Sequence, residues 1–497
     1  MLVLSLSLAY PAQSSSLDLI EVGGAWGSPG ATNPTALWWN PAGLAVAGGT
    51  QLLVEGAPTS ARFVADRYNP DYGVPDPTFV ALGYPAEYDY GGVDNLTFSG
   101  IVPFLGISSD FTVDGLGIGI GLYVPIARGG TSDQAYGPNR YALREGNIQV
   151  LAASLGAAYE LAELLSVGGS VSLLDSTYEA SLDTSIYPDI AAEAEAQAAE
   201  FNLPRPGSYQ DAYLEHPGYT ATSIFALKTQ ALTFGAGLYL QPLRSDLLGL
   251  SLAYNHGVRV DNRGPVVLDF LCPPEHDNLS RAGAQAQGTC DARLQGTGAI
   301  GYRLPSRVHL GVVGHPREKL RLEAFGSYVL WSAFTDYDIS TQISADQIQV
   351  EDPTVAEETA ALVSQRRQWA RDNRDSFFVG VDGKLELHRL LGVGLRGTFD
   401  RSAIPDRVLS ANNLDADTFI LSGLLFSAPI QQLTIGLSFS HHFLATRDVT
   451  DSAYALSIDG DPDPRYFYPS GAGRYSGSID RIGISLKGNV GGRSRQP

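Results

Sequence analysis

The feature that most constrains this chain is a regular alternation of apolar and polar residues, over stretches of about ten residues, from Thr50 onward. The apolar members of three such stretches are Leu248, Leu250, Leu252 and Tyr254; Leu433, Ile435, Leu437 and Phe439; and Ile482, Ile484 and Leu486. A period of two is typical of β-strands whose faces meet different surroundings. A water-soluble sandwich of two sheets alternates in the same way, so the pattern alone leaves both architectures open.

The connections between these stretches separate the two architectures. Short connections fall near residues 109–114, 161–163, 241–246, 316–318, 388–391 and 428–432. Long connections fall near residues 58–95, 128–146, 179–220, 261–295, 336–374, 403–416 and 447–475. Short and long connections strictly take turns, as in outer-membrane barrels with tight periplasmic turns and long external loops. The sequence therefore predicts an all-β, transmembrane antiparallel barrel of about 14 strands, an even number as single-chain bacterial barrels require.

Two further observations favour a surface that contacts lipid. Charges are missing from the apolar faces, and aromatic residues gather near strand ends at Tyr254, Tyr328, Trp331 and Phe443. No run of eighteen or more apolar residues occurs, which excludes a transmembrane helix. We therefore expect a monomeric, multi-pass protein of the bacterial outer membrane, with the lipid of that membrane as a partner.

Composition excludes some functions. The net charge of −20 and the pI near 4.7 argue against nucleic-acid binding, which needs a basic surface. Cys272 and Cys290 lie in a polar, glycine-rich loop, and in an exported protein such a pair predicts a disulfide, with two unrelated thiols as the alternative. The spacing of metal ligands is absent, so neither a metal nor a cofactor is expected.

The chain before the first strand is irregular and apolar. Residues 1–16 have the composition of an export-signal remnant, and residues 17–47 include the stretch "NPTALWWNPAGLAVA". The lumen of so large a barrel is too wide for wall side chains to fill, so we expect residues 17–47 to plug it as a hatch. Trp38 and Trp39 would supply volume, while Asn40, Pro41 and Ala42 form a turn. The alternative is an ordinary lead-in to the first strand. The barrel itself is expected over residues 48–490, with a tail at 491–497.

The long loops carry two helical patterns. Residues 189–201 are rich in Ala and Glu, and "TVAEETAALVSQRRQW" begins with a capping box of Thr354 and Glu357 and presents Leu362 and Trp369 seven residues apart. External loops with helices of their own are expected to fold over the barrel mouth, with solvated decoration as the alternative.

Four stretches, taken in order along the chain, resemble the FadL family of outer-membrane transporters for long-chain fatty acids and other hydrophobic compounds. They are "ATNPTALWWNPAGLA" (31–45), residues 306–339, "AIPDRVLSANNLDADTFILSGL" (403–424) and "YPSGAGRYSGSIDRIGISLKG" (468–488). The resemblance implies a fourteen-stranded barrel closed by the hatch. Substrate is captured among the external loops, passes to a pocket above the hatch and leaves sideways into the bilayer where the third strand kinks.

In this sequence the third strand is expected at residues 115–130, so the resemblance places the lateral exit near Gly121, Tyr123 and Pro125. Pro125 has no N–H to donate to the sheet, and strand glycines weaken the pairing around it. The alternative is a proline that merely ends a strand.

Strand parity also points Arg321, Lys384 and Arg396 inward, where a cation could bind the carboxylate of a fatty acid. The alternative is that these cations pair with the neighbouring acids Asp382, Glu386 and Glu323. The leading hypothesis is passive transport of a hydrophobic small molecule, without catalysis. An outer-membrane hydrolase acting on lipids, with His441 and His442 as candidates, and a structural or adhesive barrel remain as alternatives, although no nucleophile motif supports the hydrolase.

Overall fold

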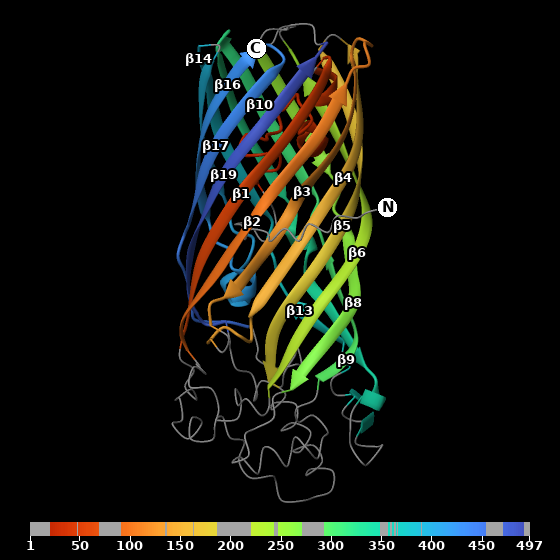
Figure 1. The fold of residues 1–497 in the computed structure, drawn as a ribbon, viewed down its shortest axis with the longest axis vertical. Coiled ribbons are helices and arrows are strands. Elements are labelled where there is room, and N and C mark those ends of the chain that lie inside the picture. The colour runs from red at the N-terminus through yellow and green to blue at the C-terminus, as the bar shows by residue number, and fades with distance from the viewer. Residues whose placement is uncertain are drawn as a thin grey trace, which may run out of the picture.

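In a computed structural model the chain forms a closed antiparallel β-barrel whose strands run obliquely along a tall cylinder (Figure 1). The structure describes residues 20–46, 48–68, 91–134, 137–162, 164–185, 220–242, 247–270, 293–347, 356–357, 360–361, 364, 366–388, 390–453 and 471–491. Cys272 and Cys290 lie outside the described residues, as do residues 1–16 and the helix expected at 189–201. The disulfide therefore stays a prediction.

The sheet has nineteen segments. They are β1 (Thr50–Arg67), β2 (Gly92–Ser109), β3 (Leu116–Ser132), β4 (Glu145–Ala162), β5 (Leu165–Ser185), β6 (Thr220–Leu240), β7 (Leu248–Asn255), β8 (Arg259–Phe270), β9 (Arg293–Arg303), β10 (Arg307–Arg317), β11 (Leu320–Val329), β12 (Asp336–Ile343), β13 (Arg366–Ala370), β14 (Ser376–His388), β15 (Leu391–Asp400), β16 (Thr418–Ile430), β17 (Leu433–Leu444), β18 (Arg447–Val449) and β19 (Gly473–Val490).

These segments make a closed barrel of 14 strands, as the sequence predicts. Five strands are each interrupted once, so that β7 continues as β8, β9 as β10, β11 as β12, β13 as β14 and β17 as β18. One interruption, between β9 and β10, contains Pro305, which cannot donate a ladder hydrogen bond. The barrel closes where β1 pairs with β19, from Thr50 opposite Val490 to Arg67 opposite Gly473. Closure leaves no free sheet edge, the condition for placing a sheet in hydrocarbon.

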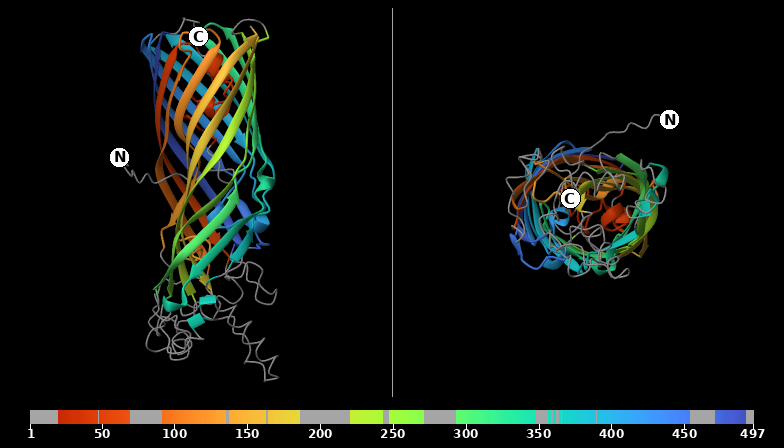
Figure 2. Two further views of the ribbon diagram at one scale, coloured as in Figure 1. Left: turned by 90° about the vertical axis from the view of Figure 1, so that its right-hand side faces the viewer. Right: turned by 90° about the horizontal axis from the view of Figure 1, so that it is seen from below.

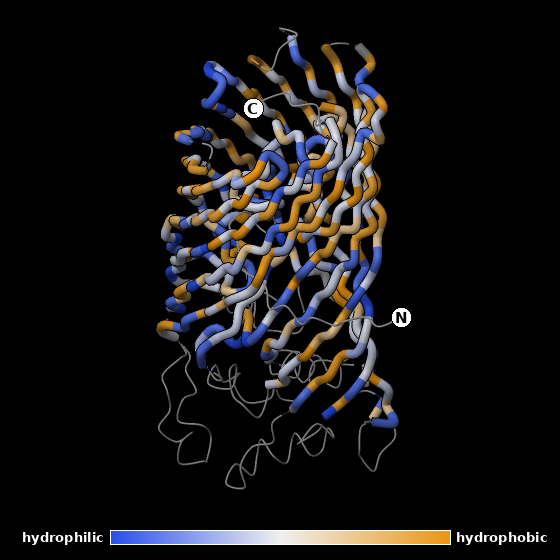
Figure 3. The backbone as a smooth tube through the Cα atoms, turned by 45° about the horizontal axis from the view of Figure 1, so that its top comes forward, coloured by the Kyte–Doolittle hydropathy of each residue, from blue (hydrophilic) through white to orange (hydrophobic). Residues whose placement is uncertain are grey.

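The outer wall carries the apolar residues of the alternating pattern. Leu437 is 49% exposed and Ile484 is 55% exposed, whereas Ser440 and Arg481 on the opposite faces of the same strands are buried. Figure 3 shows hydrophobic residues alternating with hydrophilic ones along the wall. The described part of the chain contains no helix long and apolar enough to cross a bilayer.

Two details differ from the sequence-based expectations. Trp331, expected among the aromatic residues at the membrane surface, is fully buried because it lies in a 3₁₀ turn, η3 (Trp331–Ala333), at the break between β11 and β12. Trp369, expected on a loop helix, lies in β13, where it pairs with Tyr337 of β12. Pairing with the neighbouring strand therefore overrides the local helical pattern there.

Candidate functional site

Residues 20–46, here called the hatch segment, lie inside the barrel at the end that carries the short turns (Figure 2). The segment contains turns and two single-turn helices, α1 (Ala36–Trp39) and α2 (Gly43–Val46). Asn33 fixes the entry to α1, since its side-chain oxygen accepts hydrogen bonds from the N–H and hydroxyl of Thr35. Leu37, Trp39 and Leu44 are almost completely buried.

Glycines on the inner wall allow this close contact. At Gly237 of β6 a Cβ atom would overlap the side-chain oxygen of Asn40, and at Gly117 of β3 it would overlap the carbonyl of Leu44. A larger residue at either place would push the hatch segment away from the wall.

At the other end of the segment, the Asp110 carboxylate accepts a hydrogen bond from the Gly49 N–H at 2.6 Å. This bond lowers the pKa of Asp110, a residue in the turn between β2 and β3.

A first buried ion cluster joins the hatch segment to the wall through Glu21. Its carboxylate accepts a bond from Arg481 of β19 at 3.1 Å and lies 3.4 Å from the Nε2 atom of His442 in β17. The hydroxyls of Ser440 and Ser422 also donate to it, at 3.0 and 3.3 Å. All five side chains are shielded from water, so the cluster fixes residue 21 in one position.

A second cluster holds the hatch segment from the next strands of the wall, β11, β14 and β15. Glu323 of β11 accepts bonds from the Ser28 hydroxyl at 2.8 Å and from the Gly30 N–H at 2.9 Å. Arg396 of β15 donates to the carbonyl of Gly27 at 2.8 Å and forms an ion pair with Asp382. The hatch segment is therefore held by two charged clusters on one run of neighbouring strands, from β11 to β19.

The three predicted carboxylate-binding cations lie in this second cluster. Arg321 pairs with Glu323 at 2.5 Å and with Asp382 at 3.4 Å, while Lys384 and Arg396 lie 5.2 and 5.0 Å from the ring of Trp26 in the hatch segment. All three face inward, as strand parity predicts. The ion pairs of Arg321 and Arg396 favour the alternative that these cations neutralise wall acids, and contact with a substrate carboxylate stays a prediction.

The five predicted hatch residues lie together at the wall. The Asn40 amide donates to the Leu238 carbonyl at 2.9 Å, and Pro41 and Ala42 pack over Gly168 of β5. The Trp39 indole donates to the Val22 carbonyl at 2.9 Å, whereas Trp38 presents its ring edge to Tyr123 at a centroid distance of 5.9 Å. Trp39 thus fixes the fold of the hatch segment, and Trp38 contacts the third strand.

The third strand contains one residue too many for both of its neighbours. Opposite β4, Val124 and Pro125 face the single residue Leu151, which is a β-bulge. Opposite β2, pairing stops at Phe104–Tyr123 and resumes at Thr97–Thr131, so that six residues of β2 (98–103) face seven of β3 (124–130) without pairing. We call this unpaired stretch the β2–β3 gap. Pro125 therefore lies at a real defect in the wall rather than at the end of a strand.

Tyr123 links the edge of the β2–β3 gap to the hatch segment. Its ring stacks on Phe104, its pairing partner in β2, at 5.5 Å, and it contacts the ring of Trp38. Its hydroxyl is 2.8 Å from that of Ser154 in β4. Gly121, the other predicted residue, faces the side chain of Leu37, so it provides room for the hatch segment.

A mostly apolar pocket lies directly above α1. Leu37 and Trp38 contribute to its floor, and Tyr123, Pro125 and Ile126 bring the β2–β3 gap into its wall. Its polar lining includes Arg307, whose guanidinium lies 4.8 Å from the ring of Trp38. The pocket is therefore apolar with a cation at one side, and it borders the wall defect.

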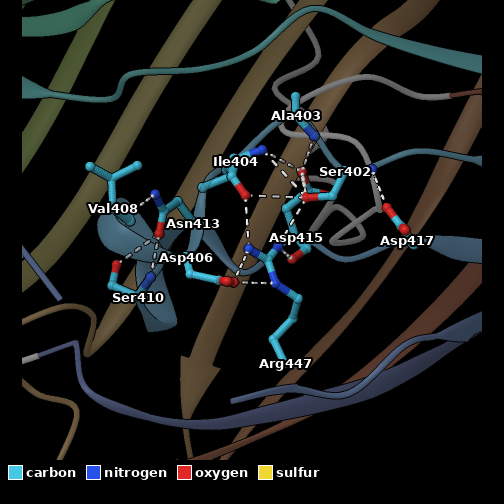
Figure 4. Close-up of polar contacts among 10 residues, drawn as sticks. All are labelled: Ser402, Ala403, Ile404, Asp406, Val408, Ser410, Asn413, Asp415, Asp417 and Arg447. Carbon is cyan, nitrogen blue, oxygen red and sulfur yellow. Dashed lines mark hydrogen bonds and ion pairs between the residues drawn. The ribbon is translucent and has the colours of Figure 1, made fainter. Parts of the chain in front are cut away.

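The loop between β15 and β16 fills the lumen from the other end. Arg447 at the start of β18 donates to the carbonyls of Ile404 and Asp415 at 3.0 and 2.8 Å and pairs with Asp406 (Figure 4). The Asp415 carboxylate accepts from the Ser402 hydroxyl and the Ala403 N–H at 2.9 Å each. These bonds close residues 401–417 into a compact unit whose apolar side chains, such as Leu409 and Leu414, are buried.

This inward loop borders a second pocket. Ala411 and Leu414 of the loop form one side, and residues 128–130 of β3 form the other. The guanidinium of Arg128 donates to the Leu414 carbonyl at 2.9 Å. Residues 123–130 of β3 thus contribute to both pockets, and the β2–β3 gap runs beside this part of the strand.

Sequence reasoning missed the anchoring acids. Glu21 gave a signal, because it is a lone acid in an apolar, glycine-rich segment, but its partners His442 and Arg481 are more than 400 residues away. Ser440 and His442 both bind Glu21 rather than each other, so they do not form a nucleophile–base pair. In the described residues no group of three or more His, Cys, Asp or Glu side chains could hold a metal ion.

Comparison with known proteins agrees with this geometry. Residues 15–466 match the family described as outer membrane protein transport protein (OMPP1/FadL/TodX). A FadL homologue from Pseudomonas aeruginosa has a similar structure, with a TM-score of 0.73, 16% identity and coverage of 96% of this chain and 100% of that one. The toluene transporter TodX of P. putida gives a TM-score of 0.57 at 14% identity, covering 93% and 95%.

The CymD monoaromatic hydrocarbon channel gives a TM-score of 0.57 at 13% identity, covering 92% of this chain and 93% of that one. No curated protein sequence matches the chain. The barrel and its long, alternating loops define the class as an outer-membrane transport barrel. The chain belongs to the OMPP1/FadL/TodX family of outer-membrane transport proteins, as the sequence resemblance indicates.

Proposed function

We propose that the protein carries hydrophobic small molecules across the outer leaflet passively, and releases them sideways into the bilayer through the β2–β3 gap. The observation that carries the proposal is the extra residue of β3 beside an apolar pocket whose floor is the hatch segment. Unpaired backbone at membrane depth is tolerated only where protein covers it or it lines a cavity. A defect retained at the wall of an apolar pocket is therefore expected to serve as an exit.

The two pockets suggest the order of events. A molecule captured by the external loops would enter the pocket beside residues 128–130 and move along β3 to the pocket above Trp38. The hatch segment would then block the direct path to the periplasm, because two charged clusters hold it in the lumen. The β2–β3 gap would remain as the way out, into a solvent that suits an apolar molecule.

Long-chain fatty acids and apolar hydrocarbons both match the mostly apolar lining of these pockets. Arg307 in the lining of the inner pocket favours a substrate with an anionic group, because a charge-assisted hydrogen bond to it would form away from water. The names of the similar structures include a toluene transporter and a monoaromatic hydrocarbon channel, which keeps aromatic hydrocarbons as candidates.

Deletion of Pro125 is the most direct test. The deletion gives β3 six residues opposite the six of β2, and one residue opposite Leu151 of β4, so both ladders can pair without a break. About six hydrogen bonds could then close the wall. At about 0.5–1.5 kcal/mol each they would contribute at least about 3 kcal/mol to the closed form. We expect uptake of radiolabelled oleate and toluene to fall at least about tenfold, in cells that depend on this protein for uptake.

Pro125→Ala is the matched control, because it removes the proline and keeps the extra residue. It should retain most of the uptake, and both variants should remain in the outer membrane as heat-modifiable barrels. Full uptake by the folded deletion variant would contradict lateral release. An equal loss of uptake in both variants would mean that uptake depends on the proline ring rather than on the register of β3 with its neighbours.

A further inference from the structure

Four cations lie together on the outer face of three adjacent strands. Lys228 of β6 is directly opposite Arg263 of β8, and Arg259 of β8 is directly opposite Arg303 of β9. All four side chains are exposed. Like charges at directly opposed positions of an antiparallel pair repel one another. Here two such pairs lie four residues apart along β8, with Asp261 between them, in a chain with a net charge of −20.

The acids nearby neutralise only part of this cluster. Asp261 pairs with Arg259 at 2.9 Å, and Asp338 pairs with Arg259 at 3.2 Å and with Arg366 at 2.8 Å. On the neighbouring strand β5, the carboxylate of Asp175 accepts a bond from Gln230. Within the described residues, Lys228, Arg263 and Arg303 have no ion pair.

The Lys228–Arg263 pair lies just outside the apolar belt, and Arg259 and Arg303 lie nearer to the belt, because Arg259 is four residues before Arg263 in β8. On β6 the outward side chains run from Phe234 (49% exposed) and Leu232 (66% exposed) to Gln230 and then Lys228. Four residues of strand between Leu232 and Lys228 span about 13 Å. With a tilt of about 40°, Lys228 is about 10 Å above Leu232 along the membrane normal. That height corresponds to the headgroup region rather than to the hydrocarbon core.

We propose that Lys228, Arg259, Arg263 and Arg303 form a binding site for a lipid headgroup that carries more than one phosphate, in the leaflet around the barrel. The phosphates would separate the opposed cations, and the acyl chains would lie on Leu232, Phe234 and Leu252 below. The site is on the outside of the wall and independent of the transport path. A lipid with such a headgroup would therefore be bound selectively at this face of the barrel.

The test uses the full-length protein in zwitterionic detergent, with diphosphoryl lipid A as the probe. The double variant K228Q/R263Q is compared with R317Q/K319Q, which removes the same charge from two exposed residues at the short turn between β10 and β11. Each cation near an anionic headgroup changes the affinity by about fivefold, so K228Q/R263Q should bind lipid A about 30-fold more weakly. The control variant should bind like the wild type.

Thermal unfolding without lipid provides a second readout. The variant K228Q/R263Q removes both members of one opposed pair and so relieves the repulsion between them. It should therefore be at least as stable as the wild type in detergent alone, and should gain less from added lipid A. Equal gains for the wild type and K228Q/R263Q would overturn the proposal. So would an equal gain of the wild type from inorganic phosphate, which would indicate a free-anion site, or from phosphatidylcholine, which would indicate acyl-chain contact alone.

Discussion

Replacing Glu21 with Gln tests whether buried charge holds the hatch segment in the lumen. Glutamine keeps the shape of the side chain and one acceptor oxygen, but removes the negative charge that faces Arg481 and His442. Arg481 is 2% exposed, so water cannot replace the lost partner unless the segment moves. We therefore expect residues 20–25 to leave the wall part of the time, while Arg396 still holds Gly27 and Glu323 still holds Ser28 and Gly30.

The size of the effect follows from the burial of the cluster. Removing one partner of a buried ion pair costs about 3–5 kcal/mol. That energy shifts the balance between the seated and the displaced segment by about 100- to 5,000-fold. Replacing both partners is less costly than removing one, because no uncompensated charge is left behind. The double variant E21Q/R481M should therefore keep the segment seated better than E21Q alone.

Single-channel recording in planar bilayers measures this balance. E21Q should show transient conductance steps that the wild type lacks, and E21Q/R481M should show fewer of them. Asp480→Asn is the matched control, because it breaks an acid–histidine pair between the same strands, β17 and β19, on the exposed side of the wall. Such a surface pair contributes about 0–1 kcal/mol. Equal conductance of E21Q and D480N would refute the argument.

Three further predictions concern the hatch segment and the inner pocket. W38A/W39A should leak ions in the same recordings and melt at lower temperature, because truncating the buried Trp39 costs about 3–5 kcal/mol; a silent, equally stable variant would contradict a sealing role. Arg307→Gln should raise the KM for oleate about 10- to 100-fold but leave toluene uptake unchanged, because only the acid gains a charge-assisted bond; an equal change for both substrates would exclude that contact. Lys384→Gln should leave uptake of both substrates unchanged, because Lys384 faces Trp26 beneath the pocket. A selective loss of oleate uptake would instead mean that Lys384 contacts the substrate.

The barrel could be predicted from the sequence because its determinants are local. Leu437 and Ser438 alternate because one faces outward and the other faces the lumen, and this pattern needs no knowledge of the neighbouring strands. The alternation of short and long connections likewise predicted the antiparallel topology, because it can be seen in the sequence without knowledge of strand pairing. Trp331 was misplaced because the break between β11 and β12, which turns it inward, leaves no signal in the alternation.

The site was predicted only in part, because its parts depend on register and distant contacts. Pro125 marks a weak place in β3, but the extra residue becomes visible only when the registers with β2 and β4 are both known. The charges of Arg321 and Arg396 are evident in the sequence, whereas their pairing with Glu323 and Asp382 depends on which strands are adjacent. Glu21 could be noticed in the sequence, but its role depends on residues at the far end of the chain.

The single surplus residue of β3 has a genetic consequence. Loss of one codon, three nucleotides in frame, is enough to bring the strand into step with both neighbours. Export, insertion and folding would all tolerate that event, and a screen for intact protein would not detect it. With the gap as the exit proposed above, only growth on a compound that must enter through this protein would expose the loss, and selection for the defect would act through nutrition rather than through structure.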